Sequence, residues 1–520
     1  MTAATGTDRP SPPPAVAAAP PRRRVVLYNP QAVFHTLPLA LLAIGSALDR
    51  ARYDVHIVDA RLEADPHAAL LAALAVPAGA PAPVCVGVTV LTGAPIRDAL
   101  AASRAVKARH PRLPVVWGGW HPSLFPAATL AEPAVDVTVA GQGEVAFAAL
   151  VDRLADGAAP CELGDLAGVS CRAAGSAAAG HAADAADATA AAAGADGAIL
   201  SGPPRPLAPV DGLPPHDYEL LPLERYFAAK GQRQLDYVAS AGCLFRCAFC
   251  ADPFVYGRRW SGLAPERVGE EAERWWRRYG FTELAFQDET FFTYKQHAVG
   301  IAEALLRRGL RFAWTATLRA DQAMRLDEEM LALCVRSGLR RVMVGVESGS
   351  QEMLDWMEKD VTVEQVLLTA ERCRRHGLGA IFPFIVGFPG ESEASVDATL
   401  ALVRRLRRMS PDFETPIFYF KPYPGSRLTA DAVRAGHRLP ETLEEWAEFD
   451  FVGSSGPWVS RQRERRVERF KFYNRMAYGR GRAWHWPAKA LARWRLERGL
   501  FALPLEKALI ERLRPLPRLS

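Results

Sequence analysis

The 520-residue sequence predicts a doubly wound parallel α/β sheet, then a partial (β/α)6 barrel, then a helical C-terminal region. Short apolar runs alternate with helical stretches over residues 24–139, and the same alternation returns over residues 235–420. Strands that alternate with helices in this way form parallel sheets. Residues 461–520 instead interleave 17 Lys+Arg and 5 Asp+Glu with aromatic residues, which predicts a separate, strongly basic region.

The first unit, residues 24–160, is expected to form the doubly wound sheet. Five apolar runs end in turn residues, and stretches with helical periodicity separate them. Residues 1–23 are rich in Ala and Pro without the pattern of a signal peptide, so we expect a disordered leader. The predicted strands cover residues 24–30, 54–59, 84–90, 114–119 and 135–139.

Glycine-rich and hydroxyl-bearing loops follow the third, fourth and fifth of these strands. Ligands of such sheets bind at the carboxyl ends of the strands, and glycine lets the backbone approach them closely. No GxGxxG follows the first strand, which argues against a dinucleotide. Two alternatives stay open. The domain could bind no ligand, and His121 could be a turn residue that packs on Pro122. The candidate ligand residues are Thr89, Leu91, Thr92, Gly118, Gly119, His121, Gly141, Gly143 and Glu144.

A linker is predicted over residues 161–232. Residues 168–172 and 198–200 have the pattern of a hairpin. Between them, residues 173–197 are rich in Ala, Gly and Asp without an apolar face, which favours a disordered insertion. Residues 203–222 are proline-rich and are expected to cross the surface between the two α/β units.

The second unit, residues 233–435, is expected to be the partial barrel. Six strand-like runs with helical stretches between them predict six βα units, which leave one side of a barrel open. A large substrate could enter through that opening. The predicted strands cover residues 235–240, 283–286, 312–316, 341–346, 380–386 and 418–420.

Three cysteines, Cys243, Cys247 and Cys250, stand in the loop after the first barrel strand. Three thiolates from one loop can hold three irons of a [4Fe–4S] cubane, and the fourth iron then lacks a protein ligand. The alternatives are a zinc site or free buried thiols, although zinc usually takes a second ligand pair that does not follow here. The other five cysteines are scattered singly, which predicts a reducing cytoplasm rather than a disulfide framework.

The CxxxCxxC spacing, with Phe249 before the last cysteine, resembles the cluster loop of the radical S-adenosylmethionine (SAM) superfamily. The GxESGS turn at residues 345–350 and the GFPGE turn at residues 387–391 resemble the branch of that superfamily with a cobalamin-binding domain. The GGxHP turn at residues 118–122 and the GxGE turn at residues 141–144 of the first unit resemble the same branch. No DxHxxG loop is present, so no histidine is expected to ligate cobalt.

This resemblance implies three cofactors: a [4Fe–4S] cluster, SAM and cobalamin. The cysteines would hold the cluster, and the glycine loops of the first unit would hold cobalamin. Arg319 would pair with the SAM carboxylate, although it could instead belong to a structural ion pair at the barrel mouth. Tyr423, most simply a turn residue, is the candidate catalytic side chain because it would lie near the substrate opening. The residues implied for SAM are Phe249, Asp288, Glu289, Arg319, Glu347, Ser348 and Gly387.

The resemblance also implies an activity. SAM would be cleaved to a 5′-deoxyadenosyl radical that removes hydrogen from a small-molecule substrate, and a methyl group would then pass to an unactivated carbon. The first alternative is a non-methylating oxidation or cyclisation, since the anaerobic magnesium-protoporphyrin monomethyl ester cyclase shares this arrangement. The second is a non-catalytic cobalamin or iron–sulfur protein. An electron donor such as flavodoxin or ferredoxin is implied.

The basic region, residues 436–520, allows three interpretations. Its aromatic and basic residues could form helices that pack over the barrel, contact an anionic membrane surface, or bind nucleic acid. No nucleic-acid-binding motif is found, so no nucleic acid partner is expected. Membrane contact would suit a hydrophobic substrate and a membrane-peripheral location. No run of about 18 apolar residues occurs, so no spanning helix is predicted.

Overall fold

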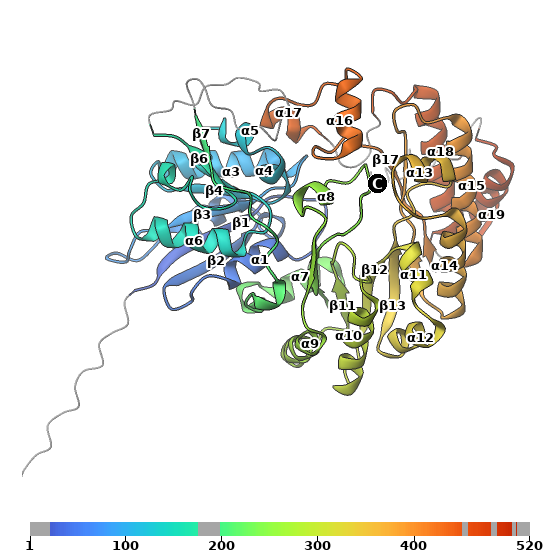
Figure 1. Cartoon of the computed structure of the whole chain (residues 1–520), viewed down its shortest axis with the longest axis horizontal. Helices are drawn as coiled ribbons and strands as arrows, with labels where there is room; N and C mark the ends of the chain where they lie inside the picture. Colours follow the sequence, from blue (N-terminus) through green and yellow to red (C-terminus); the bar gives the residue numbers. More distant parts are fainter. Residues whose placement is uncertain (1–20, 175–197, 450–455, 480–485, 502–505, 507–520) are drawn as a thin grey trace, which may run out of the picture.

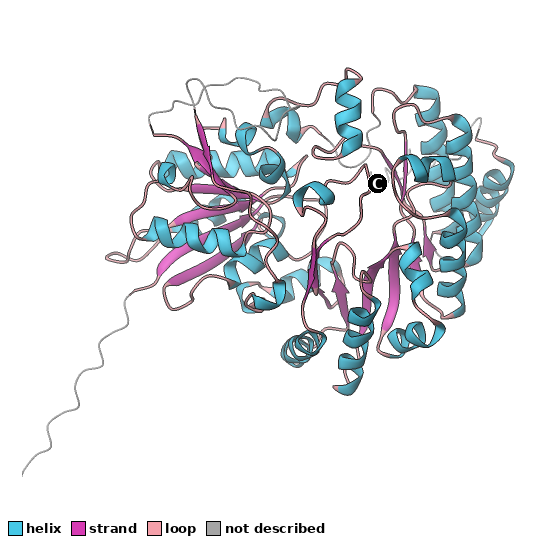
Figure 2. Cartoon of the chain, in the orientation of Figure 1, coloured by secondary structure: helices cyan, strands magenta, loops and turns pink. Residues whose placement is uncertain are grey.

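The computed structural model describes residues 21–174, 198–449, 456–479, 486–501 and 506. Figure 1 shows the N-terminal sheet and the barrel side by side, and Figure 2 shows that helices surround both sheets. Residues 1–20 of the expected leader and residues 175–197 of the expected insertion lie outside the described residues.

The N-terminal sheet has seven strands in the order β2-β1-β3-β4-β5-β6-β7. The first five strands pair in parallel, and the last two pair antiparallel at one edge. The strand order reverses between β1 and β3, which is where doubly wound sheets bind ligands. The strands are β1 (Arg23–Asn29), β2 (Tyr53–Asp59), β3 (Cys85–Thr89), β4 (Val115–Gly118), β5 (Val137–Val139), β6 (Val169–Arg172) and β7 (Ile199–Ser201).

Alternation along β1 explains the two layers of helices. Val25 and Leu27 point into one apolar core, whereas Val26 and Tyr28 point into the other. A strand buried on both faces reads as a continuous apolar run, as this one does. The predicted doubly wound fold is confirmed. The helices α2 (Pro66–Leu74), α3 (Pro95–Arg109) and α5 (Pro126–Leu130) cover one face, and α1 (Leu39–Ser46) and α6 (Glu144–Ala155) cover the other.

The predicted hairpin is present, and it extends the N-terminal sheet rather than crossing between the domains. β6 pairs with β5 and with β7, so the sheet continues to Ser201. After it, the proline-rich segment leads to α7 (Leu223–Lys230) and then to the barrel.

The barrel sheet is a six-stranded parallel sheet in the order β16-β14-β13-β12-β11-β8, which confirms the predicted partial barrel. Its fifth and sixth strands are each split in two, and Pro383 and Pro416 stand at the breaks. Proline cannot donate a ladder hydrogen bond, which accounts for the breaks. The strands are β8 (Gln234–Tyr237), β11 (Glu283–Phe286), β12 (Ala313–Leu318), β13 (Leu339–Val344), β14 (Gly379–Ile381), β15 (Phe384–Val386), β16 (Phe413–Glu414) and β17 (Ile417–Tyr419).

Helices cover the outer face of this sheet, and two short strands flank the cysteine loop. The strands β9 (Ser240–Gly242) and β10 (Trp260–Gly262) pair antiparallel. Two short helices lie near the cysteine loop instead: α8 (Asp252–Val255) follows it directly, and α13 (Gln351–Trp356) packs against Ala248 of the loop. The other helices of this unit are α9 (Pro265–Tyr279), α10 (Lys295–Arg307), α11 (Ala320–Arg325), α12 (Glu328–Arg336), α14 (Val363–Arg375) and α15 (Glu393–Met409).

The C-terminal region is helical, as predicted, and its parts pack in two places. After α16 (Arg427–Arg434), the short α17 (Leu443–Ala447) returns to the N-terminal domain, where Trp446 is buried against α3 and its neighbours. α18 (Arg461–Tyr478) and α19 (Trp486–Arg498) pack on each other, and α18 also packs on α15 at the outside of the barrel (Figure 1).

The aromatic residues of α18 serve this packing. Phe470 and Tyr473 are buried in the barrel core cluster. Asn474 donates to the Thr415 hydroxyl at 3.1 Å beside β16, so α18 covers the edge of the sixth barrel unit. None of the helices in the described parts of the chain combines the length and hydropathy that a bilayer-spanning helix needs.

Candidate functional site

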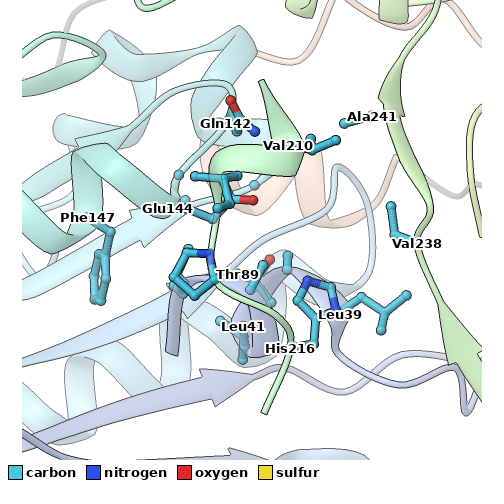
Figure 3. Close-up of a pocket in the computed structure, with 18 of the residues that line it drawn as sticks. Leu39, Leu41, Thr89, Gln142, Glu144, Phe147, Val210, His216, Val238 and Ala241 are labelled. Carbon is cyan, nitrogen blue, oxygen red and sulfur yellow. The ribbon is translucent and has the colours of Figure 1, made fainter. Parts of the chain in front are cut away.

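A cavity lies between the carboxyl ends of the N-terminal strands and the mouth of the barrel (Figure 3). It holds about 1380 Å³ not filled by protein atoms, part of it open to solvent. Thr89 and Glu144 line it from the N-terminal domain, His216 from the linker, and Ala241 and Glu289 from the barrel.

Six of the nine residues predicted to bind cobalamin line this cavity. Gly119 requires a glycine, because its φ is 94° and a Cβ would lie 3.0 Å from the Thr89 hydroxyl oxygen. Leu91, Thr92 and His121 are not among the lining residues. The six that line the cavity are Thr89, Gly118, Gly119, Gly141, Gly143 and Glu144.

Two lining residues that were not sequence candidates carry unpartnered polar atoms. Gln142 accepts from the Ala208 amide at 2.7 Å, but its buried Nε2 has no hydrogen-bond partner among the described residues. The buried Nδ1 of His216 also has none, and burial lowers the pKa of His216 to about 4. Buried polar groups are normally satisfied, so these atoms fit a ligand with amide groups around its edge, as a corrinoid has. Gln142 stands inside the GQGE turn, whereas nothing in the sequence singles out His216.

His121 lies under Trp446 rather than in the cavity. It is fully buried, its Nδ1 is 3.3 Å from the Thr92 hydroxyl, and its ring centroid is 5.7 Å from that of Trp446. Burial lowers the pKa of His121 to about 3. The imidazole is therefore neutral and acts as part of the packing between α17 and the N-terminal domain.

Stability should therefore fall on mild acidification because of His121. Its pKa is about 3 in the folded chain and about 6.5 when unfolded, so below pH 6.5 the unfolded chain binds a proton that the folded chain does not. From pH 7 to pH 5 the native protein should lose about 2 kcal/mol more unfolding free energy than His121→Phe. Urea unfolding at the two pH values measures this, and equal losses would show that His121 does not carry the effect.

The cysteine loop is held rigidly in place. Cys243 and Cys247 are each 8% exposed, and Cys250 is partly buried. The loop begins at Gly242, whose φ is 87° and whose Cβ, if present, would lie 2.3 Å from the Arg259 carbonyl oxygen. In its middle, the Ala248 amide donates to the Met357 carbonyl at 2.9 Å. These contacts tie the loop to the residue before β10 and to the residue after α13.

The donor set fits a cubane cluster. Burial raises the pKa of the Cys243 thiol to about 11 and that of Cys250 well above its usual value, so metal loading would release protons. No three His, Cys, Asp or Glu side chains in the described ranges converge on a single-ion site. Each cysteine of a cubane binds a different iron, so its three thiols need not converge on one point.

Asp288 and Glu289 support the start of this loop. Asp288 accepts from the Ser240 hydroxyl at 2.5 Å, and burial raises the pKa of Asp288 to about 7. Glu289 accepts from the Gly242 amide at 3.2 Å and from the Tyr256 hydroxyl at 3.1 Å. Glu289 also lines the cavity, whereas Asp288 does not.

Arg319 has partners other than the expected one. Its Nε donates to Asp321 at 2.9 Å, its Nη2 to the Lys359 carbonyl at 2.5 Å, and its Nη1 lies 3.5 Å from Cys247 Sγ. The guanidinium carbon sits 3.7 Å from the ring centroid of Phe245. The side chain is therefore committed to the cysteine loop, and a bidentate pair with a SAM carboxylate would require it to leave these partners.

Glu347 pairs with a lysine that was not a sequence candidate. Its carboxylate lies 2.7 Å from Lys359 Nζ, and both side chains are buried. Its φ of 69° is uncommon for a residue with a Cβ, and strained backbone of this kind clusters at functional sites. Lys359 Nζ is also 5.6 Å from the ring centroid of Phe249. The structure thus groups Phe249, Glu347 and Lys359 beside the cluster loop.

The other three barrel candidates are held by local contacts. Ser348 Oγ lies 3.2 Å from the Thr399 hydroxyl on α15. The Gly387 amide donates to Glu391 at 2.6 Å, and the Gly387 carbonyl accepts from the Trp458 indole. The ring of Tyr423 meets that of Phe449 at 5.7 Å.

Comparisons with known proteins decide the family. A model described as the radical SAM superfamily matches residues 237–403, and one described as the B12 binding domain matches residues 23–151. A protein of Pyrococcus horikoshii named uncharacterized methyltransferase PH0819 is 31% identical over 73% of this chain and 76% of its own length. The chain belongs to the cobalamin-dependent branch of the radical SAM superfamily. The predicted family and its three cofactors, the [4Fe–4S] cluster, SAM and cobalamin, are confirmed.

Other relatives of this radical SAM protein include enzymes that are named for different reactions, a cyclase and a methyltransferase. The anaerobic magnesium-protoporphyrin IX monomethyl ester cyclase of Rubrivivax gelatinosus is 26% identical over 66% of this chain and 58% of its own length. The cytidylyl-2-hydroxyethylphosphonate methyltransferase of Streptomyces wedmorensis is 25% identical over 62% of each chain. This chain therefore spans about three-fifths of those two relatives.

Solved structures share the fold of the chain. The radical SAM methyltransferase TsrM from Kitasatospora setae, with cobalamin and a [4Fe–4S] cluster bound, covers 92% of this chain and 99% of its own at a TM-score of 0.63 and 19% identity. The cobalamin-dependent radical SAM enzyme OxsB covers 95% and 73% at a TM-score of 0.67 and 16% identity.

Proposed function

We propose that the chain is a cobalamin-dependent radical SAM methyltransferase that methylates an unactivated carbon of a small molecule. One observation carries this proposal: a single cavity is lined both by the glycine loops of the B12-binding domain and by Ser240, Ala241 and Glu289 beside the cysteine loop. When bound, the cluster with SAM supplies a radical that abstracts hydrogen from carbon, and cobalamin supplies the methyl group. Cofactors held on these two sides of the cavity would act on one substrate.

The residues of the chain would divide this work. Cys243, Cys247 and Cys250 would hold the cluster, and the glycines at 118, 119, 141 and 143 would admit the corrinoid to the backbone. Glu289 would fix the loop through the Gly242 amide while its carboxylate, whose pKa burial raises, faces the cavity. The interface between the domains would exclude water from the radical.

Two partners stay predictions. Reduction requires a one-electron donor such as flavodoxin or ferredoxin. Among the described residues of the C-terminal region, Trp486 and Trp494 of α19 support membrane contact, because their side chains are 71% and 44% exposed.

The test is anaerobic reconstitution of the full chain with iron, sulfide and hydroxocobalamin, followed by addition of SAM and a one-electron reductant. We expect both 5′-deoxyadenosine and S-adenosylhomocysteine, because radical formation and methyl transfer each consume SAM. Omitting cobalamin should remove S-adenosylhomocysteine and leave 5′-deoxyadenosine. Both products are measured by liquid chromatography.

Other outcomes favour the alternatives. 5′-Deoxyadenosine without S-adenosylhomocysteine, with cobalamin bound, would indicate oxidation or cyclisation, as the similarity to the Rubrivivax cyclase allows. Neither product, from a chain that holds both cofactors, would indicate a binding protein.

A further inference from the structure

We propose that Arg319 is a positioning residue that anchors Cys247 and raises the reduction potential of the iron–sulfur cluster. The inference rests on the cluster of the proposed function. It deepens that function by naming a residue that sets the potential at which the cluster accepts an electron.

The geometry of Arg319 points to the cluster loop. Two of its four contacts are on that loop: Nη1 lies 3.5 Å from Cys247 Sγ, and the guanidinium carbon stacks 3.7 Å from the Phe245 ring centroid. The other two contacts hold the guanidinium from the barrel side, and they are made with Asp321 and with the Lys359 carbonyl. A planar guanidinium with several donors can meet all these partners at once, which an ammonium cannot.

The charge of Arg319 is buried, and its carboxylate hydrogen-bond partner is shared. Its side chain is 7% exposed, and arginine stays protonated in proteins. Its partner Asp321 is shared, because Arg325 Nη2 lies 2.9 Å from the other carboxylate oxygen. Two guanidinium groups therefore face one carboxylate, and the buried one is nearest to Cys247 Sγ. By contrast, the neighbouring Lys359 has Glu347 as its own counter-ion at 2.7 Å.

A cation and an N–H donor at a ligating sulfur favour the reduced cluster. Hydrogen bonds to the sulfurs and the net charge set the potentials of iron–sulfur clusters. Reduction adds one electron from a one-electron donor protein, breaks no bond and needs no proton. The added negative charge interacts more favourably with a nearby guanidinium at low dielectric, so Arg319 should raise the potential.

The test is a redox titration of the reconstituted full chain, followed by electron paramagnetic resonance of the reduced cluster. In Arg319→Gln we expect the ratio of reduced to oxidised cluster at a fixed potential to fall about tenfold, which is a shift of about 59 mV to lower potential. Arg319→Lys keeps the charge and should recover part of the shift. Arg325→Gln is the matched control, because it removes the other partner of Asp321 without touching the loop, and it should leave the potential unchanged.

Each outcome decides the inference. An unchanged potential in Arg319→Gln, at equal iron content, would overturn it, and so would an equal shift in Arg325→Gln. If Arg319→Gln takes up no iron, the potential of Arg319→Lys decides. A lower value than in the native protein would support the contact between the guanidinium and Cys247 Sγ, and an equal value would overturn the role of that contact. A native chain that binds no four-iron cluster would refute the proposed function itself, which separates the two failures.

Discussion

Alanine in place of Cys243, Cys247 or Cys250 should abolish both the cluster and the formation of 5′-deoxyadenosine. Only these three thiols come from one loop, and each is expected to bind a separate iron, so a missing thiol leaves a cubane with two protein ligands. The loop is anchored independently of the metal by the Ala248 and Gly242 amides, so the variants should still fold. Iron and sulfide content per chain and the yield of 5′-deoxyadenosine measure the effect.

Cys334→Ala and Cys373→Ala are the matched controls. Both thiols are buried on barrel helices, in the same apolar core and away from the loop. Their replacement should lower stability modestly and leave the iron content unchanged. Retention of SAM cleavage by Cys243→Ala would refute the assignment of the site.

Glu347→Gln should destabilise the cluster-free chain by about 3–5 kcal/mol, because it leaves the buried ammonium of Lys359 without its counter-ion. The two side chains are 10% and 7% exposed, so water cannot replace the lost carboxylate. Denaturant unfolding followed by circular dichroism measures the change. The double variant Glu347→Gln, Lys359→Met should recover much of the loss, since it removes the unpaired charge.

The control for this pair is the ion pair of Arg246 with Asp360 at 2.9 Å, which is about half exposed on both sides. Asp360→Asn should cost about 1 kcal/mol or less, because solvent screens exposed pairs. A loss in Glu347→Gln no larger than that in Asp360→Asn would contradict the role of burial at Glu347.

Local signals in the sequence predicted most elements of both sheets and part of the cavity. Apolar runs and turn residues predicted the strands of both sheets except β16 at the edge of the barrel sheet. The ends of β3, β4 and β5 and the loops after them predicted six of the residues that line the cavity. These features depend on neighbours in the chain and on strand ends that meet at one edge, so a pattern is enough to find them.

Contacts over long sequence separations were not predictable from the same patterns. Nothing near residue 121 shows that Trp446 will cover His121, and nothing near residue 319 shows that its guanidinium will meet Cys247. The pairing of Glu347 with Lys359 also depends on how α13 returns to the barrel mouth. In each case tertiary packing decides which residue becomes the partner. The local sequence pattern therefore does not identify it.

The most direct measurement for the central claim is the electron paramagnetic resonance spectrum of the reduced, reconstituted chain before and after addition of SAM. The account predicts a four-iron signal that SAM changes, because one iron would have no protein ligand and would be open to SAM. A signal that SAM leaves unchanged, or a chain that holds zinc in place of a four-iron cluster, would contradict it.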